Sequence, residues 1–448
     1  MKENMKRSLV LALLLVIAGA AWAIPWPLYP RNQTHPIGNN WGEYQDYGTG
    51  PYYHNGVDVF PQHQGDPVIA VAHGWVKAWG TIEAQYHYRM AISDSPPSVA
   101  RRCPGWLYAH IDASRTHKAV GAEVNEGDTI GYLVPWPVTG FDHTHFARIS
   151  DTGTTWNRFP DPTWWFTDNP LLFFTPLLDT VLPTIQDART GQRFAVCHNN
   201  TDSYFNDLNN ITGDVDIVVR AYDKTGVPTS DPTWDKLLPY KYVWSAQGSV
   251  AGIPPTLGII NSGWMPAPFV GATIPVEFKD ASPCQSLGDY DNRDYFVVAT
   301  NNADGDSTIE ITDTAGCWHT GAFPDDYYWI KISVSDVVGN VRTDSMRVRT
   351  NNGVGVAEKG RTGSWHNLNV PTVTRAGSNL ALSLNLPQGG IVRLDLFDLS
   401  GRLEQTAFAG ELCAGLHSLS FSPKRAGIHL LVLTEGQDRI VHKMTVVQ

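Results

Sequence analysis

The chain has few cysteines and few charged residues for its length. Of its 448 residues, 5 are cysteine and 17% are charged, and the formal net charge at pH 7 is -11. An odd number of cysteines leaves at least one thiol unpaired, and no Cys-x-x-Cys pair indicates a structural zinc site. The negative charge argues against a nucleic-acid partner and against an anionic surface bound by bulk charge.

Two common hydrolase signatures are also missing. No His-Glu-x-x-His occurs, which argues against a helix-borne zinc site with a glutamate general base. No Gly-x-Ser-x-Gly occurs, so a serine nucleophile is poorly supported. Beyond the N-terminal segment, no stretch of about eighteen apolar residues offers a membrane span. The mature chain is therefore expected to have no transmembrane segment.

The N-terminus has the pattern of a secretory signal. Three basic residues precede the apolar run LVLALLLVIAGAA, and a small-x-small cleavage site ends at Ala23. Residues 1–23 are predicted to be a signal peptide that is removed before Ile24. No cysteine follows the cleavage site, so a lipid anchor is not indicated. We expect a secreted protein, extracellular or at the cell surface.

Composition predicts a mainly β protein. The chain contains 40 glycines, 30 prolines and 16 tryptophans, as expected for strands joined by many turns. Its length corresponds to roughly three domains at about 150 residues each. We place the first at residues 24–175.

Two histidine motifs in this first region carry the functional signal. His54-x-x-x-Asp58 and His143-x-His145 stand far apart in the sequence, with His110 between them. Imidazole and carboxylate are ligands that Zn²⁺ accepts, and three protein ligands leave a fourth position open for water. Residues two or four apart share a face of a strand. His54 and Asp58 can therefore point at one ion, and a ligand and a catalytic group can share the strand of His143 and His145.

Three blocks of sequence resemble the lysostaphin-type (LytM-like) zinc metallopeptidases. HNGVDVFPQHQGDPVIAVAHGWV is similar to the opening block of that family, His-x-Gly-x-Asp followed by Gly-x-Pro-Val-x-Ala and Gly-x-Val. YAHIDASRTHKAVGAEVNEGDTIGYL resembles its Tyr-x-His strand and the following turn, and HTHF resembles the closing His-x-His-Phe strand. The match covers about a third of the chain. It implies an antiparallel β metallopeptidase domain.

The resemblance also implies roles for the five residues. His54, Asp58 and His145 would hold one Zn²⁺ in the catalytic domain, and His110 and His143 would be catalytic. A zinc-bound water has a pKa of about 7, which supplies a nucleophile at neutral pH. One of the two imidazoles would orient or deprotonate the water, and the other would stabilise the oxyanion or protonate the leaving amine. Which residue does which stays open.

The approach to the last motif departs from the family pattern. The chain has VPWPVTGFDHTHFARI where the family has a glycine-rich loop, and Ala147 follows the Phe where the family has Glu. Trp136, between two prolines, replaces small flexible residues, which alters the expected substrate groove. Asp142 has two readings: a solvated turn residue, which we favour, or a hydrogen-bond partner that fixes an imidazole tautomer.

Residues 180–350 predict an immunoglobulin-like β-sandwich with long loops. Alternating runs such as VDIVVRAYD and YYWIKISVSD end in turn signals. The aperiodic stretch PTLGIINSGWMPAP is interpreted as a loop that contacts the catalytic domain. Residues 327–329, Tyr-Tyr-Trp, are expected in the core, and residues 304–306, Asp-Gly-Asp, as a plain acidic turn in preference to a calcium site. Cys284 and Cys317 are a hypothetical disulfide.

Residues 351–375 are predicted to be a linker and residues 376–448 a C-terminal β-sandwich for sorting or anchoring. Short strands with glycine at the turns support the sandwich. The segments FDLSGR, AGLH and the terminal KMTV resemble the C-terminal sorting domains of type IX secretion cargo. That resemblance implies outer-membrane secretion machinery as a partner. A plain adhesion module is the alternative.

The sequence thus predicts a secreted zinc metalloendopeptidase. By resemblance, its substrate is a peptide bond in peptidoglycan stem peptides or cross-links. Two alternatives remain at this point: a peptidase of soluble or matrix proteins, which the altered groove permits, and a catalytically silent LytM-like module that binds cell wall or regulates another hydrolase. A silent module is expected to lack ligands, and here all three are present.

Overall fold

The computed structural model separates the chain into two compact units, residues 1–353 and residues 354–448. The described residues are 23–47, 50–80, 87–112, 114–115, 118–156, 166–262, 265–266, 273–353, 367–371, 373–386, 389–398, 402–435 and 438–448. Residues 1–22 of the predicted signal peptide lie outside them. No helix within these ranges is both long and apolar enough to cross a membrane.

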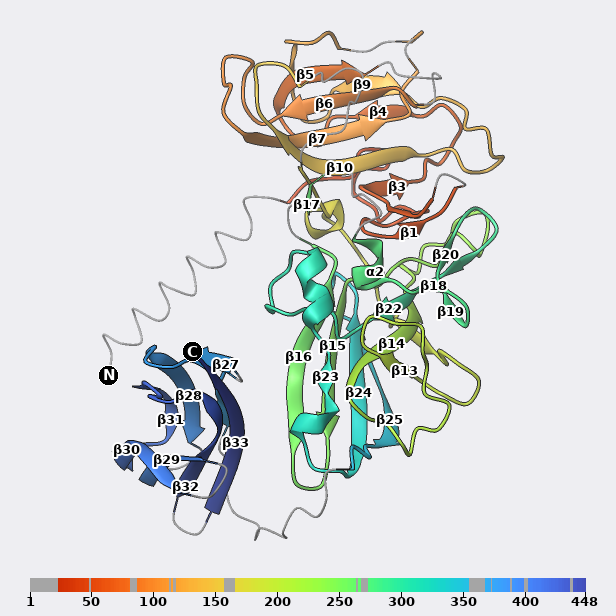
Figure 1. Ribbon diagram of the computed structural model, residues 1–448. Helices are drawn as coiled ribbons and strands as arrows, with labels where there is room; N and C mark the ends of the chain where they lie inside the picture. Colours follow the sequence, from red (N-terminus) through yellow and green to blue (C-terminus); the bar gives the residue numbers. More distant parts are fainter. Residues whose placement is uncertain are drawn as a thin grey trace, which may run out of the picture. The chain divides into compact units, whose positions relative to one another are not determined.

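The prediction of a mainly β protein is confirmed. Mostly antiparallel sheets make up both units, and the one α-helix in the described ranges, α2 (Ile274–Glu277), has four residues (Figure 1). Proline near the start of α2 suits a first helical turn, and the following residue is already extended. The frequent turns follow from the glycines, many of which have positive φ.

An eight-stranded sheet forms the N-terminal part of the first unit. Its order is β17 (Met265–Pro266), β11 (Phe166–Asp168), β10 (Thr144–Asp151), β7 (Cys103–Ala109), β6 (Arg89–Ser93), β5 (Gly74–Gly80) and β8 (Glu123–Val124), with β3 (Val57–Val59) also paired to β10. Strands β10 and β7 are almost wholly buried, so both of their faces are covered. Two small two-stranded sheets lie beside it: the hairpin of β1 (Tyr44–Gln45) with β2 (Tyr52–Tyr53), and the pair of β4 (Pro67–Ile69) with β9 (Thr129–Tyr132), which are distant in sequence.

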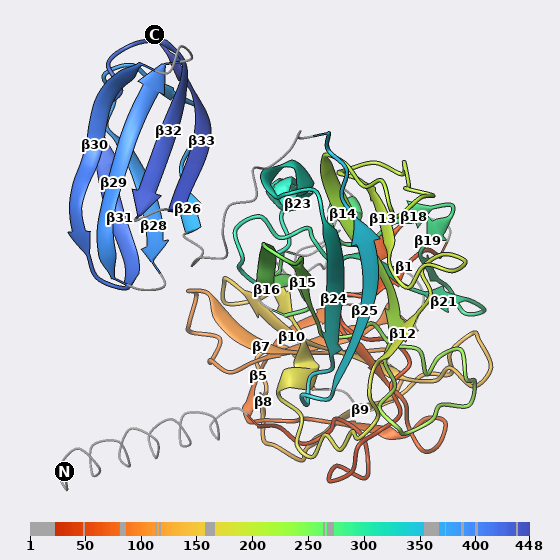
Figure 2. The same cartoon turned by 90° about the horizontal axis from the view of Figure 1, so that it is seen from below.

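Two further sheets form the rest of the first unit (Figure 2). In the five-stranded sheet, β14 (Asp214–Tyr222) pairs with β12 (Thr184–Gln186), β13 (Ala195–His198), β22 (Phe296–Val298) and β23 (Trp318–His319). The four-stranded sheet has the order β16 (Gly252–Ile260), β15 (Lys241–Gln247), β24 (Tyr327–Ser335) and β25 (Val341–Arg349). Two short ladders, β18 (Asp280–Ala281) with β19 (Cys284–Gln285) and β20 (Leu287–Gly288) with β21 (Arg293–Asp294), complete it.

One hydrophobic core runs through both parts of this unit. A single cluster of buried side chains extends from Ile24 in the N-terminal part to Val348 in β25. The stretch PTLGIINSGWMPAP contributes to the join, although it is not all loop: its first residues belong to β16, and Met265 and Pro266 pair with β11 of the N-terminal sheet. Residues 24–175 and 180–350, which the sequence divides, therefore pack within one compact unit.

Two expectations for the middle region need correction. Of residues 327–329, only Tyr328 is in the core; Tyr327 and Trp329 are 42% and 48% exposed, because strand β24 alternates its side chains between two faces. Cys284 and Cys317 do not form a disulfide, and all five cysteines are free. Residues 304–306 form an exposed acidic turn, as expected, with Gly305 at a φ of +80°.

The second unit is a two-layer sandwich. One sheet has the order β26 (Asn367–Asn369), β28 (Leu380–Leu386) and β31 (Gly415–Phe421). The other has the order β27 (Val373–Arg375), β33 (Asp438–Val447), β32 (Gly427–Glu435), β29 (Gly390–Asp398) and β30 (Leu403–Leu412). Leucine at alternate positions of β28 faces a separate buried cluster. This unit has its own core, so it does not need the first unit to bury apolar surface.

Candidate metal centre

Strand β10 gathers the predicted site residues at one of its ends. It lies between β3 and β7 in the sheet, and His145 on β10 is paired directly with Asp58 on β3. Side chains of directly opposed residues project from the same face of an antiparallel pair. His143 immediately precedes β10, and His110 immediately follows β7. Five residues spread over ninety positions are thus brought to one place by strand pairing.

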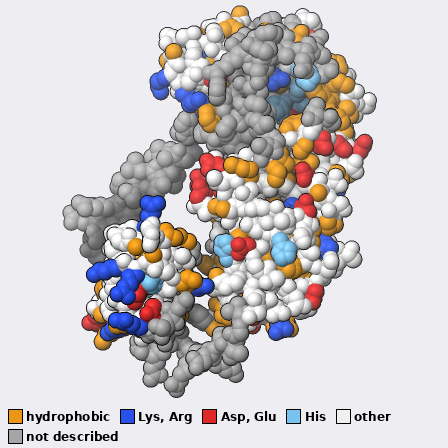
Figure 3. All heavy atoms as spheres, in the orientation of Figure 1, with side chains coloured by type: hydrophobic (Ala, Val, Ile, Leu, Met, Phe, Trp, Pro, Cys, Tyr) orange, Lys and Arg blue, Asp and Glu red, His pale blue; other side chains and the backbone are white. Residues whose placement is uncertain are grey.

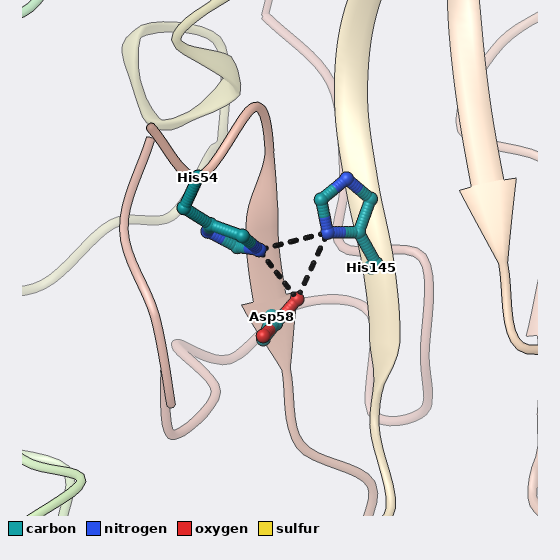
Figure 4. Close-up of side chains that lie close together, drawn as sticks. All are labelled: His54, Asp58 and His145. Atoms are coloured by element: carbon teal, nitrogen blue, oxygen red, sulfur yellow. Dashed lines mark hydrogen bonds and ion pairs between the residues drawn. The ribbon is translucent and has the colours of Figure 1, made fainter. Parts of the chain in front are cut away.

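Three donor atoms, one from each predicted ligand, lie close together (Figure 4). His54 Nε2 is 2.9 Å from His145 Nδ1 and 3.2 Å from Asp58 Oδ1, and His145 Nδ1 is 3.1 Å from Asp58 Oδ1. Ligands around tetrahedral zinc at about 2.0–2.1 Å are about 3.3 Å apart. The donor set and its spacing therefore fit one Zn²⁺, bound by two neutral imidazoles and a carboxylate.

His54 reaches the site through a turn and not through strand periodicity. Strand β3 begins only at Val57, so residues 54 to 56 bend toward β10. The turn brings Gly56 against His145: a β-carbon at Gly56 would lie 2.5 Å from His145 Nε2 and 2.8 Å from the Phe146 carbonyl oxygen. Only glycine allows this approach. The sequence prediction that His54 and Asp58 face one ion agrees with the geometry, but for a different reason.

Hydrogen bonds orient the ligand side chains. His54 Nδ1 donates to the Asn40 carbonyl oxygen at 2.9 Å, which leaves Nε2 with its lone pair toward the site. Asn39 donates its side-chain amide to Asp58 Oδ2, so Oδ1 remains toward the imidazoles. Such outer partners set the tautomer and orientation of metal ligands. Asn39 was not predicted as a site residue, because it belongs to no recognisable motif or spacing.

The ionisation of the ligands is set by burial and by their mutual charges. Burial acts to raise the pKa of Asp58, but His143 and His54 outweigh it and hold that pKa well below its usual range. Burial lowers the pKa of His145 to about 4. For His54, burial acts to lower the pKa, but the Asp58 carboxylate outweighs it and leaves the pKa raised. An ionised carboxylate and a neutral His145 are the states that a metal ion requires.

His110 and His143 lie side by side next to the three ligands. Their ring centroids are 4.5 Å apart, and His143 Nε2 is 3.5 Å from Asp58 Oδ1. His143 Nδ1 donates to the Phe141 carbonyl oxygen at 2.6 Å. His110 has a φ of +64°, a left-handed conformation that costs about 1 kcal/mol for a residue with a β-carbon. The carbonyl of His110 accepts a hydrogen bond from Val134 at 3.0 Å, which helps to hold this turn.

Trp136 covers the two histidines. Its ring lies 4.5 Å from that of His110 and 4.8 Å from that of His143. Asp142 Oδ1 accepts a hydrogen bond from the Trp136 backbone N–H at 2.6 Å, so Asp142 holds the loop that carries Trp136. Of the two interpretations of Asp142, that of a turn residue fits this contact, although its side chain is half-buried and not simply solvated.

The middle region also contributes to the surroundings of the site. Tyr290, from the loop between β20 and β21, accepts a hydrogen bond from Trp136 Nε1 at 3.0 Å and packs its ring 4.9 Å from that of Tyr47. Figure 3 shows histidine side chains reaching the surface beside hydrophobic side chains in the N-terminal part of the molecule. The wall of the site is therefore aromatic and is built from two regions that are distant in sequence.

A buried acid and base lie behind the ligands. Glu43 and Arg293 have side chains that are each 1% exposed, with Arg293 Nη1 3.9 Å from Glu43 Oε2. Glu43 Oε1 accepts a hydrogen bond from Leu238 N–H at 2.9 Å, and Arg293 donates to the Gly38 carbonyl. Burial raises the pKa of Glu43 to about 7, against the lowering effect of Arg293 and His54. Sequence analysis did not find this pair, whose members are 250 positions apart.

Gly56→Ala is expected to weaken zinc binding about 10–100-fold, the range seen when groups that orient metal ligands are changed. The added methyl would collide with the His145 ring and with backbone, so the ring must move away from Asp58. Competition with a chromogenic chelator measures the effect. Gly321→Ala is the matched control, because its β-carbon would meet no atom closer than 3.9 Å. Equal zinc affinity in both variants would contradict the packing argument.

Comparison with known proteins gives likenesses to peptidases of the M23 type. The catalytic domain of the antimicrobial peptidase lysostaphin from Staphylococcus simulans is 24% identical over 31% of this chain and 91% of its own, with a TM-score of 0.23. A catalytic-domain mutant of the prophage-encoded M23 protein EnpA from Enterococcus faecalis is 18% identical over 29% and 88%, with a TM-score of 0.22. Another lysostaphin structure matches 64% of this chain and 96% of its own at 13% identity, with a TM-score of 0.26. No protein-family model and no curated protein matches the chain.

Proposed function

We propose that this protein is a secreted zinc metalloendopeptidase that hydrolyses peptide bonds in peptidoglycan stem peptides or cross-links. The observation that carries the proposal is the cluster of His54, Asp58 and His145 donor atoms, 2.9–3.2 Å apart, with two further imidazoles beside it. A structural zinc site usually has four protein ligands, whereas a catalytic site has three. Within the described residues, three ligands form the cluster.

The two remaining imidazoles supply proton transfer. Because the Phe141 carbonyl can only accept a hydrogen bond, neutral His143 carries its proton on Nδ1 and presents the lone pair of Nε2 toward Asp58. Burial lowers the pKa of His143, which keeps it neutral and able to accept a proton from water. A bound Zn²⁺ would supply Lewis acidity and acidify a bound water. His110, in ring contact with His143, would then face the oxyanion or the leaving amine.

The substrate class and location rest on the sequence resemblances. The three blocks shared with lysostaphin-type enzymes favour peptidoglycan, and the basic and apolar N-terminus favours export. The C-terminal unit, with Lys443, Met444, Thr445 and Val446 on β33, is proposed as the sorting or anchoring domain of type IX secretion. Trp136 and Tyr290 would form the aromatic wall of the peptide groove.

Zinc content and bond cleavage test the proposal together. The mature chain, purified and dialysed, should contain one zinc per molecule by elemental analysis. It should release soluble peptides from purified sacculi, and mass spectrometry of those peptides identifies the bond. A chelator should abolish cleavage and added zinc should restore it.

Two other outcomes of these measurements would favour two other functions. Cleavage of denatured protein without release from sacculi would favour the peptidase of soluble or matrix proteins. Zinc binding without cleavage of either substrate would contradict the proposal that the protein is an enzyme. It would favour the catalytically silent cell-wall module.

A further inference from the structure

A second cluster of acidic side chains lies away from the zinc site. Asp179 is in the segment that leads to β12, Asp223 follows β14, and Asp336 follows β24. One carboxylate oxygen from each lies within 4.8 Å of the others. The three residues therefore bring together the connecting segment and one strand end from each sheet of the middle region.

The cluster lines a small cavity. The cavity has a volume of about 10 Å³, which is about the space of one water molecule or one ion. Its lining includes the oxygen-bearing side chains of Asn40, Thr225 and Tyr240 besides the three aspartates, and no lysine, arginine or histidine. Five leucine and valine residues complete the lining, so the cavity is small, partly polar and without a protein cation.

Asp223 has an unused acceptor in this cavity. The residue is 6% exposed, and its Oδ1 atom is buried with no hydrogen-bond partner in the described part of the chain. Burying a carboxylate oxygen without a partner is costly unless a cation or a proton compensates it. Burial and the charges of Asp179 and Asp336 raise the pKa of Asp223 to about 8, and no neighbouring cation lowers it.

The other two carboxylates accept hydrogen bonds from backbone groups, and that of Asp179 accepts one from the Val181 N–H at 2.8 Å. Asp336 Oδ1 accepts hydrogen bonds from Val338, Gly339 and Asn340 N–H at 2.7–3.0 Å. Asn340 also donates its amide to Asp336 Oδ2 at 2.6 Å and to the Asp179 carbonyl at 3.1 Å. The positions of these acids are therefore set by the protein before any ion binds.

We propose that Asp179, Asp223 and Asp336 form a Ca²⁺ site that ties the connecting segment to both sheets of the middle region. Three oxygen atoms within 4.8 Å of one another lie at most about 2.8 Å from a common centre, which is close to the calcium–oxygen distance of about 2.3–2.6 Å. Calcium takes carboxylate, carbonyl and water oxygens in flexible geometry, whereas magnesium demands near-octahedral geometry at about 2.0–2.1 Å. The ion's role is structural and is separate from hydrolysis at the zinc site.

Calcium binding to the whole zinc-loaded chain tests the site. After equilibrium dialysis against 5 mM CaCl₂, the wild type should hold one calcium per molecule, and its melting temperature should rise by several degrees relative to the same protein in calcium-free buffer. That concentration exceeds the dissociation constants of about 10⁻⁴–10⁻³ M typical of extracellular calcium modules. Asp223→Asn should lose both the bound calcium and the thermal shift. In calcium-free buffer it should melt no lower than the wild type, since a like charge has been removed.

Two further variants keep the test decisive. Asp179→Asn changes a partly exposed member of the cluster and should also lose calcium, so it serves if Asp223→Asn does not fold. Asp306→Asn, in the exposed acidic turn, should behave like the wild type. Absence of bound calcium in the wild type, undiminished binding by a cluster variant, or an equal thermal shift with MgCl₂ would overturn the proposal. None of these readouts depends on peptidase activity.

Discussion

The His110→Ala variant is expected to keep its zinc and to lose kcat/KM by about 10²–10⁴-fold, the usual contribution of a proton-transferring side chain. His110 is near the ligands without being one of them: its ring centroid is 6.2 Å from that of His145 and 4.5 Å from that of His143. The variant therefore removes a proposed proton-transferring side chain and leaves the three proposed metal-binding atoms in place. Zinc content by elemental analysis and release of peptides from sacculi measure the two effects separately.

The His54→Ala variant is the contrasting case. It should lose both zinc and hydrolysis, because it removes one of the three proposed ligands and one of the imidazoles beside Asp58. His73→Ala is the matched control, since His73 is exposed and pairs with Glu123 away from the site. If His110→Ala also lost its zinc, or if it retained full activity, the assignment of His110 as a catalytic group would be wrong.

The Arg293→Met variant is expected to lower the free energy of unfolding by about 3–5 kcal/mol, the range for removing one partner of a buried ion pair. Glu43 would then lie buried without a cation, and one hydrogen bond to the Gly38 carbonyl would be lost. Arg293 comes from β21 and Glu43 from the segment before β1, so the variant should also loosen the join between the two regions. The urea midpoint of the first unit's unfolding transition in the full chain measures the effect.

Two companion variants separate charge from packing. Adding Glu43→Gln to Arg293→Met removes the carboxylate that Arg293→Met leaves unpaired. The double variant should regain a large part of the lost free energy of unfolding. Arg220→Met breaks a more exposed pair with Asp294, whose side chains are 34% and 20% exposed, and should cost only about 1 kcal/mol or less. A loss from Arg293→Met no larger than that from Arg220→Met would show that the buried pair does not stabilise the join.

Local patterns and the family resemblance predicted the strands and the residues that meet at the candidate site, but not how the two main regions pack. Alternation in VDIVVRAYD and YYWIKISVSD predicted β14 and β24, because residues on a strand alternate between faces. The same rule could not say which of Tyr327 and Tyr328 faces the core, since both are aromatic. The contact of Met265 and Pro266 with β11 was equally hidden, because no pattern in a short extended segment names its partner strand.

By itself, the sequence determined the mainly β architecture, since alternation is a local property of the chain, and its resemblance to a known family singled out the five residues that the fold brings together. Only the tertiary structure decided what surrounds them. Asn39 on Asp58, Tyr290 on Trp136, and Arg293 beside Glu43 are contacts between segments up to 250 positions apart. Contacts of this kind depend on how the folded sheets pack, and buried charges and tautomers follow from that packing.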